Sequence, residues 1–240
     1  MNAPDPVDAA RRAVATWFPQ ARAAWLAGSV ARGAGTSTSD LDITVLLDGK
    51  PAPHRDSRRF EGWPVELFVH TEASLGHYRA RDAARRQPTM MRLVGESVVL
   101  VDVDGSGTPL QADCRAQVAD GPPPLAADEV AASRYAVSEL IEDLLGATDP
   151  LERTAVATAL WDHALRLLLA GSGRWVGTGK GLVREVVALD SEQTSTRAAT
   201  FDAALRGALE GDVRALVEAA DEVLRPWGGR LFEGYRVGGV

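Results

Sequence analysis

A glycine followed by three prolines, at residues 121–124, divides the chain into two parts with different sequence patterns. Proline lacks a backbone N–H and restricts the residue before it, so such a run is typical of a linker. Before the run, short apolar strands alternate with helical segments, whereas every apolar pattern after it has the period of a helix. The sequence therefore predicts an α+β domain over residues 1–120 and an all-α helical bundle over residues 121–240.

The predicted elements follow from apolar periodicity and from capping residues. In the first domain we expect strands over residues 23–27, 41–47, 64–70 and 97–102, and helices over residues 5–17, 74–86, 89–94 and 110–118. In the second domain we expect helices marked by Val130–Leu144 and Val156–Leu168, and further helices near residues 180–190, 197–209 and 212–225.

Two carboxylates lie at the start of the second predicted strand. Because side chains alternate faces along a strand, Asp40 and Asp42 point the same way, while Leu41 and Ile43 point to an apolar face that packs against helices. Neighbouring carboxylates repel each other unless a cation lies between them, and hard oxygen ligands of this kind suit magnesium. The alternative is a serine-rich turn followed by a strand that begins with aspartates by chance, but the order and spacing with the preceding glycine and serine favour a metal site.

The third predicted strand carries a third carboxylate. Glu66 lies on the face opposite Val65 and Leu67, so it joins Asp40 and Asp42 if the two strands are neighbours. It then acts as a metal ligand or as the general base that takes a proton from an attacking hydroxyl, and the sequence leaves both roles open. His70 shares this face, and we interpret it as a packed strand histidine.

A possible phosphate site precedes the aspartates. The first strand ends at Gly28-Ser29, where a helical turn presents free backbone N–H groups to phosphate oxygens. Glycine allows close approach, the serine hydroxyl adds a donor, and Arg32 follows one turn later.

These residues resemble a known signature. Gly28-Ser29, a loop containing Arg32, and the run from Ser39 to Asp42 resemble the DNA polymerase β superfamily of nucleotidyltransferases, and the aminoglycoside nucleotidyltransferases in particular. The resemblance implies a mixed sheet with helices on one face, followed by a helical domain. It also implies one or two Mg²⁺ ions and ATP or another NTP as co-substrate, with AMP passed to a hydroxyl of a small-molecule acceptor. An aminoglycoside acceptor would make the protein an antibiotic-resistance enzyme.

The resemblance further implies a basic residue from the helical domain at the triphosphate. Lys180 follows a glycine-rich loop after the helix that contains Trp161, and it is the matching candidate. Ser39, like Gly28, Ser29 and Arg32, is assigned to the nucleotide site. The alternative for Lys180 is that it simply begins the next helix. A P-loop is excluded because Arg174 and Gly181 occupy the positions of its glycine and its serine or threonine.

Composition excludes several other classes of protein. The formal charge is −7, with 33 acidic and 26 basic residues, which argues against a nucleic-acid partner. Cys114 is the single cysteine, and no histidine pair has the spacing of a zinc site. The chain has neither a leader pattern nor an apolar run that could span a membrane, so we expect a cytoplasmic protein.

Some questions stay open at this level. Acidic residues outnumber basic ones over residues 121–160; they form a solvated helix face or a cleft wall that attracts a polycationic acceptor. The acceptor could instead be a protein or an RNA, or the chain could be a non-catalytic regulatory module similar to the minimal nucleotidyltransferase antitoxins. The preferred NTP and the oligomeric state are not determined by the sequence.

Overall fold

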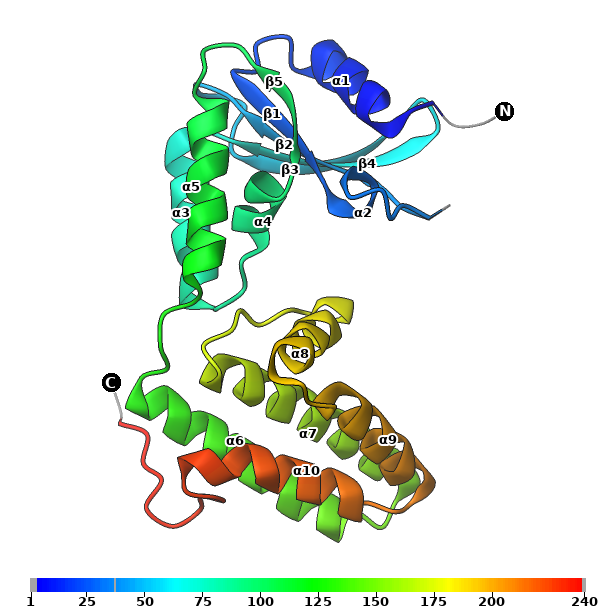
Figure 1. Cartoon of the computed structure of the whole chain (residues 1–240), viewed down its shortest axis with the longest axis vertical. Coiled ribbons are helices and arrows are strands. Elements are labelled where there is room, and N and C mark those ends of the chain that lie inside the picture. Colours follow the sequence, from blue (N-terminus) through cyan, green and yellow to red (C-terminus); the bar gives the residue numbers. More distant parts are fainter. Residues whose placement is uncertain (1–3, 37, 239–240) are drawn as a thin grey trace. The chain divides into compact units, whose positions relative to one another are not determined.

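The computed structural model describes residues 4–36 and 38–238, which divide into two compact units, Met1–Gly121 and Pro122–Val240 (Figure 1). The first unit contains a five-stranded sheet with helices, and the second contains helices. The predicted fold class, an α+β domain with a mixed sheet followed by an all-helical region, is confirmed.

The sheet of the first unit has the strand order β3-β4-β2-β1-β5. Strands β2 and β4 are parallel, and all other neighbouring strands are antiparallel. In chain order, the elements of this unit are α1 (Pro6–Trp17), β1 (Ala23–Ala27), α2 (Gly28–Ala31), β2 (Leu41–Leu46), β3 (His54–Phe60), β4 (Trp63–His70), α3 (Glu72–Ala84), α4 (Thr89–Gly95), β5 (Val98–Asp102) and α5 (Gly107–Asp120).

Helix α1 covers one face of this sheet. Asp5 caps it by accepting hydrogen bonds from the backbone N–H groups of Val7 and Asp8, both at 3.0 Å, and Pro6 occupies the first turn as expected. The buried face of the helix consists of small residues that let it approach the strands closely: Ala9, Ala10, Ala13 and Val14. They pack against the apolar face of β2 and β4, which includes Ile43 and Leu67.

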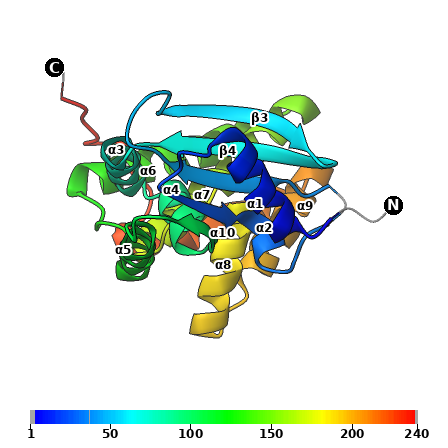
Figure 2. The same cartoon turned by 90° about the horizontal axis from the view of Figure 1, so that it is seen from above.

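Helices also cover the opposite face, which corrects the expectation of helices on one face only. Trp25 and Leu46 pack there against Leu75 of α3, Met90 of α4 and Cys114 of α5. The reason is that β1 is buried on both sides, so its apolar residues need a cover on each face. Figure 1 shows α1 on one side of the strands and α3, α4 and α5 on the other, and in Figure 2, seen from above, α1 lies over the strands.

Strand β3 was not predicted. Its sequence, HRDSRRF, lacks the apolar alternation of a half-buried strand, and most of its residues are exposed or partly exposed. It forms because it pairs along its length with β4 through a tight turn at Glu61 and Gly62, both with positive φ. Its charges are typical of an edge strand, where they discourage pairing with other chains.

The second unit has its own apolar core, to which each α-helix described there contributes. These are α6 (Ala127–Gly146), α7 (Pro150–Gly171), α8 (Lys180–Gln193), α9 (Arg197–Glu210) and α10 (Arg214–Leu224), followed by a 3-10 turn, η1 (Arg225–Trp227). The predicted helices in this region are confirmed. Within residues 4–36 and 38–238, every helix is too short or too polar to cross a membrane.

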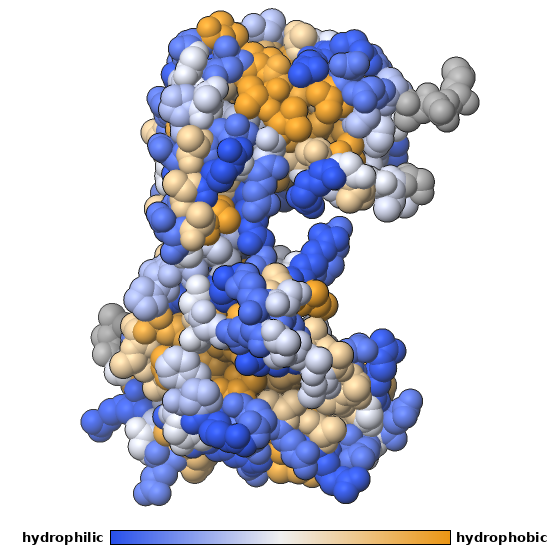
Figure 3. Space-filling model, in the orientation of Figure 1, coloured by the Kyte–Doolittle hydropathy of each residue, from blue (hydrophilic) through white to orange (hydrophobic). Residues whose placement is uncertain are grey.

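The drawn surface is mostly hydrophilic in both units (Figure 3). An apolar area lies over the first unit near the edge strand β5, whose Val98, Val99 and Val101 are partly exposed. In the second unit, the largest exposed apolar side chains include Leu151, at 81% exposure, and Phe232, at 75%.

Candidate active site

Parallel pairing of β2 with β4 brings three carboxylates together. Asp42 lies directly opposite Glu66 in the register, and Asp40 precedes β2 by one residue. One ligand oxygen of each of these three side chains lies within 4.8 Å of the other two, and all three side chains are half-buried. Strands β2 and β4 are therefore neighbours, which the sequence alone could not show. Asp40, Asp42 and Glu66 form one cluster.

The electrostatics of the cluster centre on Asp42. Burial, followed by the negative charges of Asp40 and Glu66, raises the pKa of Asp42 to about 6, from an ordinary value of 3.8. The positive charges of Arg55 and Arg32 act in the opposite direction. The charged form of Asp42 is thus poorly stabilised by the protein alone, as expected for a site that a cation completes.

Gly28 is the residue that makes room for Asp42. Register between β1 and β2 places Ala27 opposite Asp42, and Gly28 follows with a φ of +83°. A Cβ atom at Gly28 would lie 2.5 Å from Oδ2 of Asp42. Any other residue at this position would therefore both strain the backbone and collide with the carboxylate.

Ser29 and Ser39 connect the turn after β1 to the loop before β2. Their Oγ atoms lie 3.0 Å apart, and Oγ of Ser39 also accepts a hydrogen bond from the backbone N–H of Thr36 at 2.9 Å. This contact fixes the loop between the glycine turn and the aspartates. Arg32, at the end of the one-turn helix α2, is exposed, and its charge acts on Asp42.

Arg55 is a site residue that the sequence did not reveal. Its Nη2 donates a hydrogen bond to Oε2 of Glu66 at 2.6 Å, and its guanidinium lies 5.0 Å from the ring centroid of Phe68. Arg55 lies on β3, and no sequence pattern predicted that strand. The contact occupies one oxygen of Glu66 and leaves the other for a ligand.

Farther along the same face, the polar side chains are buried. His70 is 5% exposed with Nδ1 3.2 Å from Oγ of Ser74, and burial lowers the pKa of its imidazole to about 4. The prediction of a packed strand histidine is therefore confirmed. Oγ1 of Thr44 and Nε1 of Trp25 are also buried, and neither has a hydrogen-bond partner among the residues that the structure describes.

Lys180 belongs to the second unit, where it is the exposed first residue of α8. Two of the glycines near it have packing reasons of their own. A Cβ at Gly177 would lie 2.2 Å from the carbonyl carbon of Gly181, and one at Gly171 would lie 2.6 Å from the ring of Trp227. Close packing thus explains Gly171 and Gly177, whereas Gly173 and Gly179 have a positive φ and open space around them. The contact of Lys180 with a triphosphate stays a prediction.

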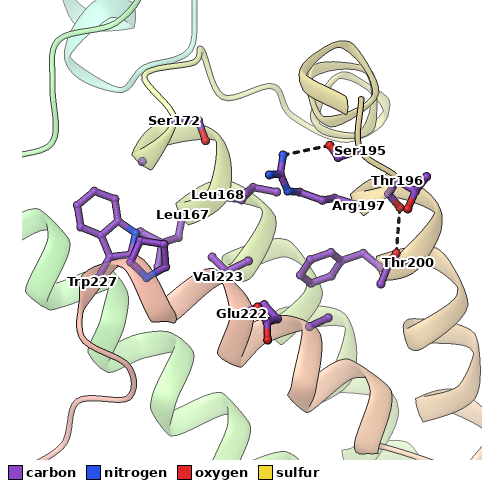
Figure 4. Close-up of a pocket in the computed structure, with 14 residues that line it drawn as sticks. Leu167, Leu168, Ser172, Ser195, Thr196, Arg197, Thr200, Glu222, Val223 and Trp227 are labelled. Carbon is purple, nitrogen blue, oxygen red and sulfur yellow. Dashed lines mark hydrogen bonds between the residues drawn. The ribbon is translucent and has the colours of Figure 1, made fainter. Parts of the chain in front are cut away.

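Each unit also contains a cavity. A cavity in the helical unit has a volume of about 530 Å³ and lies between the ends of α7, α9 and α10 (Figure 4). Trp227 and Val223 give it apolar walls, while Arg197 and Thr200 contribute polar groups. A cavity of about 340 Å³ in the first unit lies between β3, β4, α3 and α4.

The three carboxylates fit a divalent metal ion. They offer only oxygen atoms, these oxygens are close enough to share one ion, and burial together with the charges of Asp40 and Glu66 raises the pKa of Asp42. Such a donor set is typical of Mg²⁺ or Mn²⁺ rather than of zinc, which favours histidine and cysteine.

Comparison with known proteins agrees with this site. Residues 7–76 match a family model described as nucleotidyltransferase domain, and this range contains the glycine turn and all three carboxylates. The match supports a nucleotidyltransferase, a transferase of the EC 2.7.7 type. No curated protein sequence matches the chain.

Among solved structures, the chain is similar to a nucleotidyltransferase-like protein from Exiguobacterium sibiricum 255-15. The two share 13% sequence identity with a TM-score of 0.49, and the match covers 92% of this chain and 74% of that one.

Proposed function

We propose that this chain transfers AMP from ATP to a hydroxyl group of a small-molecule acceptor and releases pyrophosphate, with Mg²⁺ as the metal. The observation that carries the proposal is the cluster of Asp40, Asp42 and Glu66 beside Gly28, within a region that matches a nucleotidyltransferase domain. The sequence already indicated this chemistry, and the register of β2 and β4 supports it.

The residues of the chain divide the work as follows. Asp40, Asp42 and Glu66 would hold one or two metal ions. When bound, these ions neutralise charge on the phosphates and favour in-line attack at the α-phosphorus. Gly28 and Ser29 would bind the β- and γ-phosphates through backbone N–H and hydroxyl groups, and Ser39 positions Ser29 for that contact.

Glu66 has two possible roles, and Arg55 bears on both. Because Arg55 occupies Oε2 of Glu66, Oε1 is the oxygen that can bind a metal or accept the proton of the acceptor hydroxyl. Lys180 and Arg32 are proposed to add positive charge at the triphosphate. Aminoglycosides are the first acceptors to test, on the resemblance in the sequence.

The test is an assay of pyrophosphate release. The full chain is incubated with Mg²⁺, each of the four NTPs and a panel of hydroxyl-bearing acceptors that includes aminoglycosides. We expect release with ATP and at least one acceptor, and we expect Asp42→Asn to abolish it. Asp56→Asn should keep it, because Asp56 lies on β3, pairs with Arg58 and is not part of the cluster. Equal release by the wild type and Asp42→Asn would refute the proposal.

A further inference from the structure

The cavity in the first unit lies beside the carboxylate cluster, on the same face of the sheet. Phe68 of β4 and Arg55 of β3 form one wall, and Tyr78, Arg81 and Arg85 form another from α3 and the residue after it. Its volume of about 340 Å³ is within the range of small-molecule sites.

Positive charge dominates this cavity, in contrast to the chain as a whole. Arg55, Arg81 and Arg85 line it together with one acidic residue, Asp82, and the charge of Arg55 is shared with Glu66. Asp82 is buried, and its Oδ2 accepts a hydrogen bond from the backbone N–H of Met90 at 2.8 Å. In a chain of net charge −7, such a concentration of arginines favours an anionic ligand.

Two of the arginines are held in place by aromatic rings. The guanidinium of Arg81 lies 4.4 Å from the ring centroid of Tyr78, and that of Arg55 lies 5.0 Å from the centroid of Phe68. Cation–π contacts of this kind orient a planar guanidinium without using its hydrogen-bond donors. The donors of Arg81 therefore stay available for a phosphate or carboxylate, which arginine binds in a bidentate manner, whereas Arg55 already uses Nη2 in its contact with Glu66.

The order of the strands places the cavity on one particular side of the carboxylates. Across the sheet, the Gly28 turn follows β1, Asp42 lies on β2, Glu66 on β4 and Arg55 on β3. In nucleotidyl transfer the attacking hydroxyl and the leaving pyrophosphate lie on opposite sides of the α-phosphorus. If the pyrophosphate is held at Gly28, the acceptor approaches from the side of β3 and β4, where the cavity lies.

We propose that this cavity binds an anionic group, a phosphate or a carboxylate, of the acceptor whose hydroxyl receives the nucleotide. That the ligand is the acceptor of the reaction rests on the proposed function. The anion site itself does not depend on turnover. It also makes a claim about specificity: Arg81 and Arg85 attract an anion and repel a polycation, so an anionic acceptor is expected to be used in preference to an aminoglycoside.

Direct titration tests the anion site. Inorganic phosphate and, separately, acetate are titrated into the full chain without metal or nucleotide, and binding is followed by NMR or calorimetry. We expect saturable binding that Arg81→Ala and Arg85→Ala each weaken about tenfold or more, because a charge-assisted hydrogen bond is lost. The tighter of the two anions identifies the group that the acceptor carries. Arg11→Ala on α1, an exposed arginine paired with Asp8, is the matched control and should bind as the wild type does.

A second titration separates the acceptor site from the nucleotide site. Phosphate binding is repeated with Mg²⁺ and a saturating non-hydrolysable ATP analogue, and both ligands should bind at once. Competition between them, or phosphate binding that Arg81→Ala and Arg85→Ala leave unchanged, would overturn the inference. If the analogue itself fails to bind with Mg²⁺, the proposed function fails, while the dependence of phosphate binding on the two arginines still decides the anion site.

Discussion

The two faces of strands β2 and β4 are made by alternate residues of the same segments, yet they differ in almost every physical property. On one face, Ile43, Val45 and Leu67 are fully buried against α1. On the other face, Asp42 and Glu66 form a half-buried cluster of like charges. Alternation along a strand thus lets one short segment supply both the core and the chemistry.

The comparison shows what each face contributes to the free energy of folding. The apolar face stabilises the unit by burying hydrocarbon. The polar face opposes folding, because burial and repulsion raise the pKa of Asp42 and because the Thr44 hydroxyl is buried without a partner among the described residues. A face that lowers stability and contains three carboxylates is expected at a ligand site, because a bound ligand offsets the unfavourable burial and repulsion.

The largest expected effect is on activity. Asp42→Asn removes a proposed metal ligand, and we expect nucleotidyl transfer to fall about a thousandfold or more, since a metal's contribution of several kcal/mol is lost. Pyrophosphate release measures it. Asp56→Asn, with its carboxylate outside the cluster, should retain activity, and a similar loss in both variants would show that the effect is not specific to the cluster.

A substitution on the apolar face should act on stability instead. Ile43→Ala leaves a cavity under α1, and we expect the free energy of unfolding to fall by about 2–5 kcal/mol. Val103→Ala, at a position that is 76% exposed, should change it by about 0.5 kcal/mol or less. Urea unfolding monitored by fluorescence compares the two variants. Equal changes in the free energy of unfolding would mean that the buried face does not stabilise the fold.

Substitution of Gly28 should have two effects, one on the backbone and one on the Asp42 carboxylate, and a second glycine allows them to be separated. Gly28→Ala should cost about 1–2 kcal/mol for the positive φ, and it should also weaken metal binding because the new Cβ displaces the Asp42 carboxylate. Gly33 has a φ of +70°, but a Cβ atom there would meet nothing within 4 Å, so Gly33→Ala should show only the backbone cost. Thermal unfolding and metal titration of both variants test this, and equal metal affinity in the two would contradict it.

The last predicted effect is a gain in stability, the opposite of what most substitutions cause. Because the folded-state pKa of Asp42 is about 6 and its ordinary value is 3.8, the metal-free protein should lose stability as pH rises from about 4 to about 6 and stay level above that. Asn cannot ionise, so Asp42→Asn should be more stable than the wild type at pH 7, by about 1–3 kcal/mol. Thermal unfolding in chelator between pH 4 and pH 8 tests the difference, which should vanish at the acid end.

Strong patterns let the sequence predict much of the fold and the centre of the site. The strand that follows Asp40 and the helix capped by Asp5 were predicted because alternation and capping are local properties. The pairing of Asp42 with Glu66 was only conditional, since strand order depends on contacts distant in sequence. The structure supplies that order.

The elements that were missed lack a local signal. Strand β3 is polar and forms only because β4 offers an edge, so Arg55 and the arginine-lined cavity could not be placed. Helices on the second face follow from the burial of β1 on both sides, which a five-residue apolar strand does not reveal.

The central claim is that Asp40, Asp42 and Glu66 hold a divalent cation, and titration with Mn²⁺ followed by EPR in the presence of a non-hydrolysable ATP analogue tests it most directly. The account predicts saturable binding to the wild type and to Asp56→Asn, and its loss in Asp42→Asn with the fold intact by circular dichroism. Equal Mn²⁺ binding by all three proteins would contradict it.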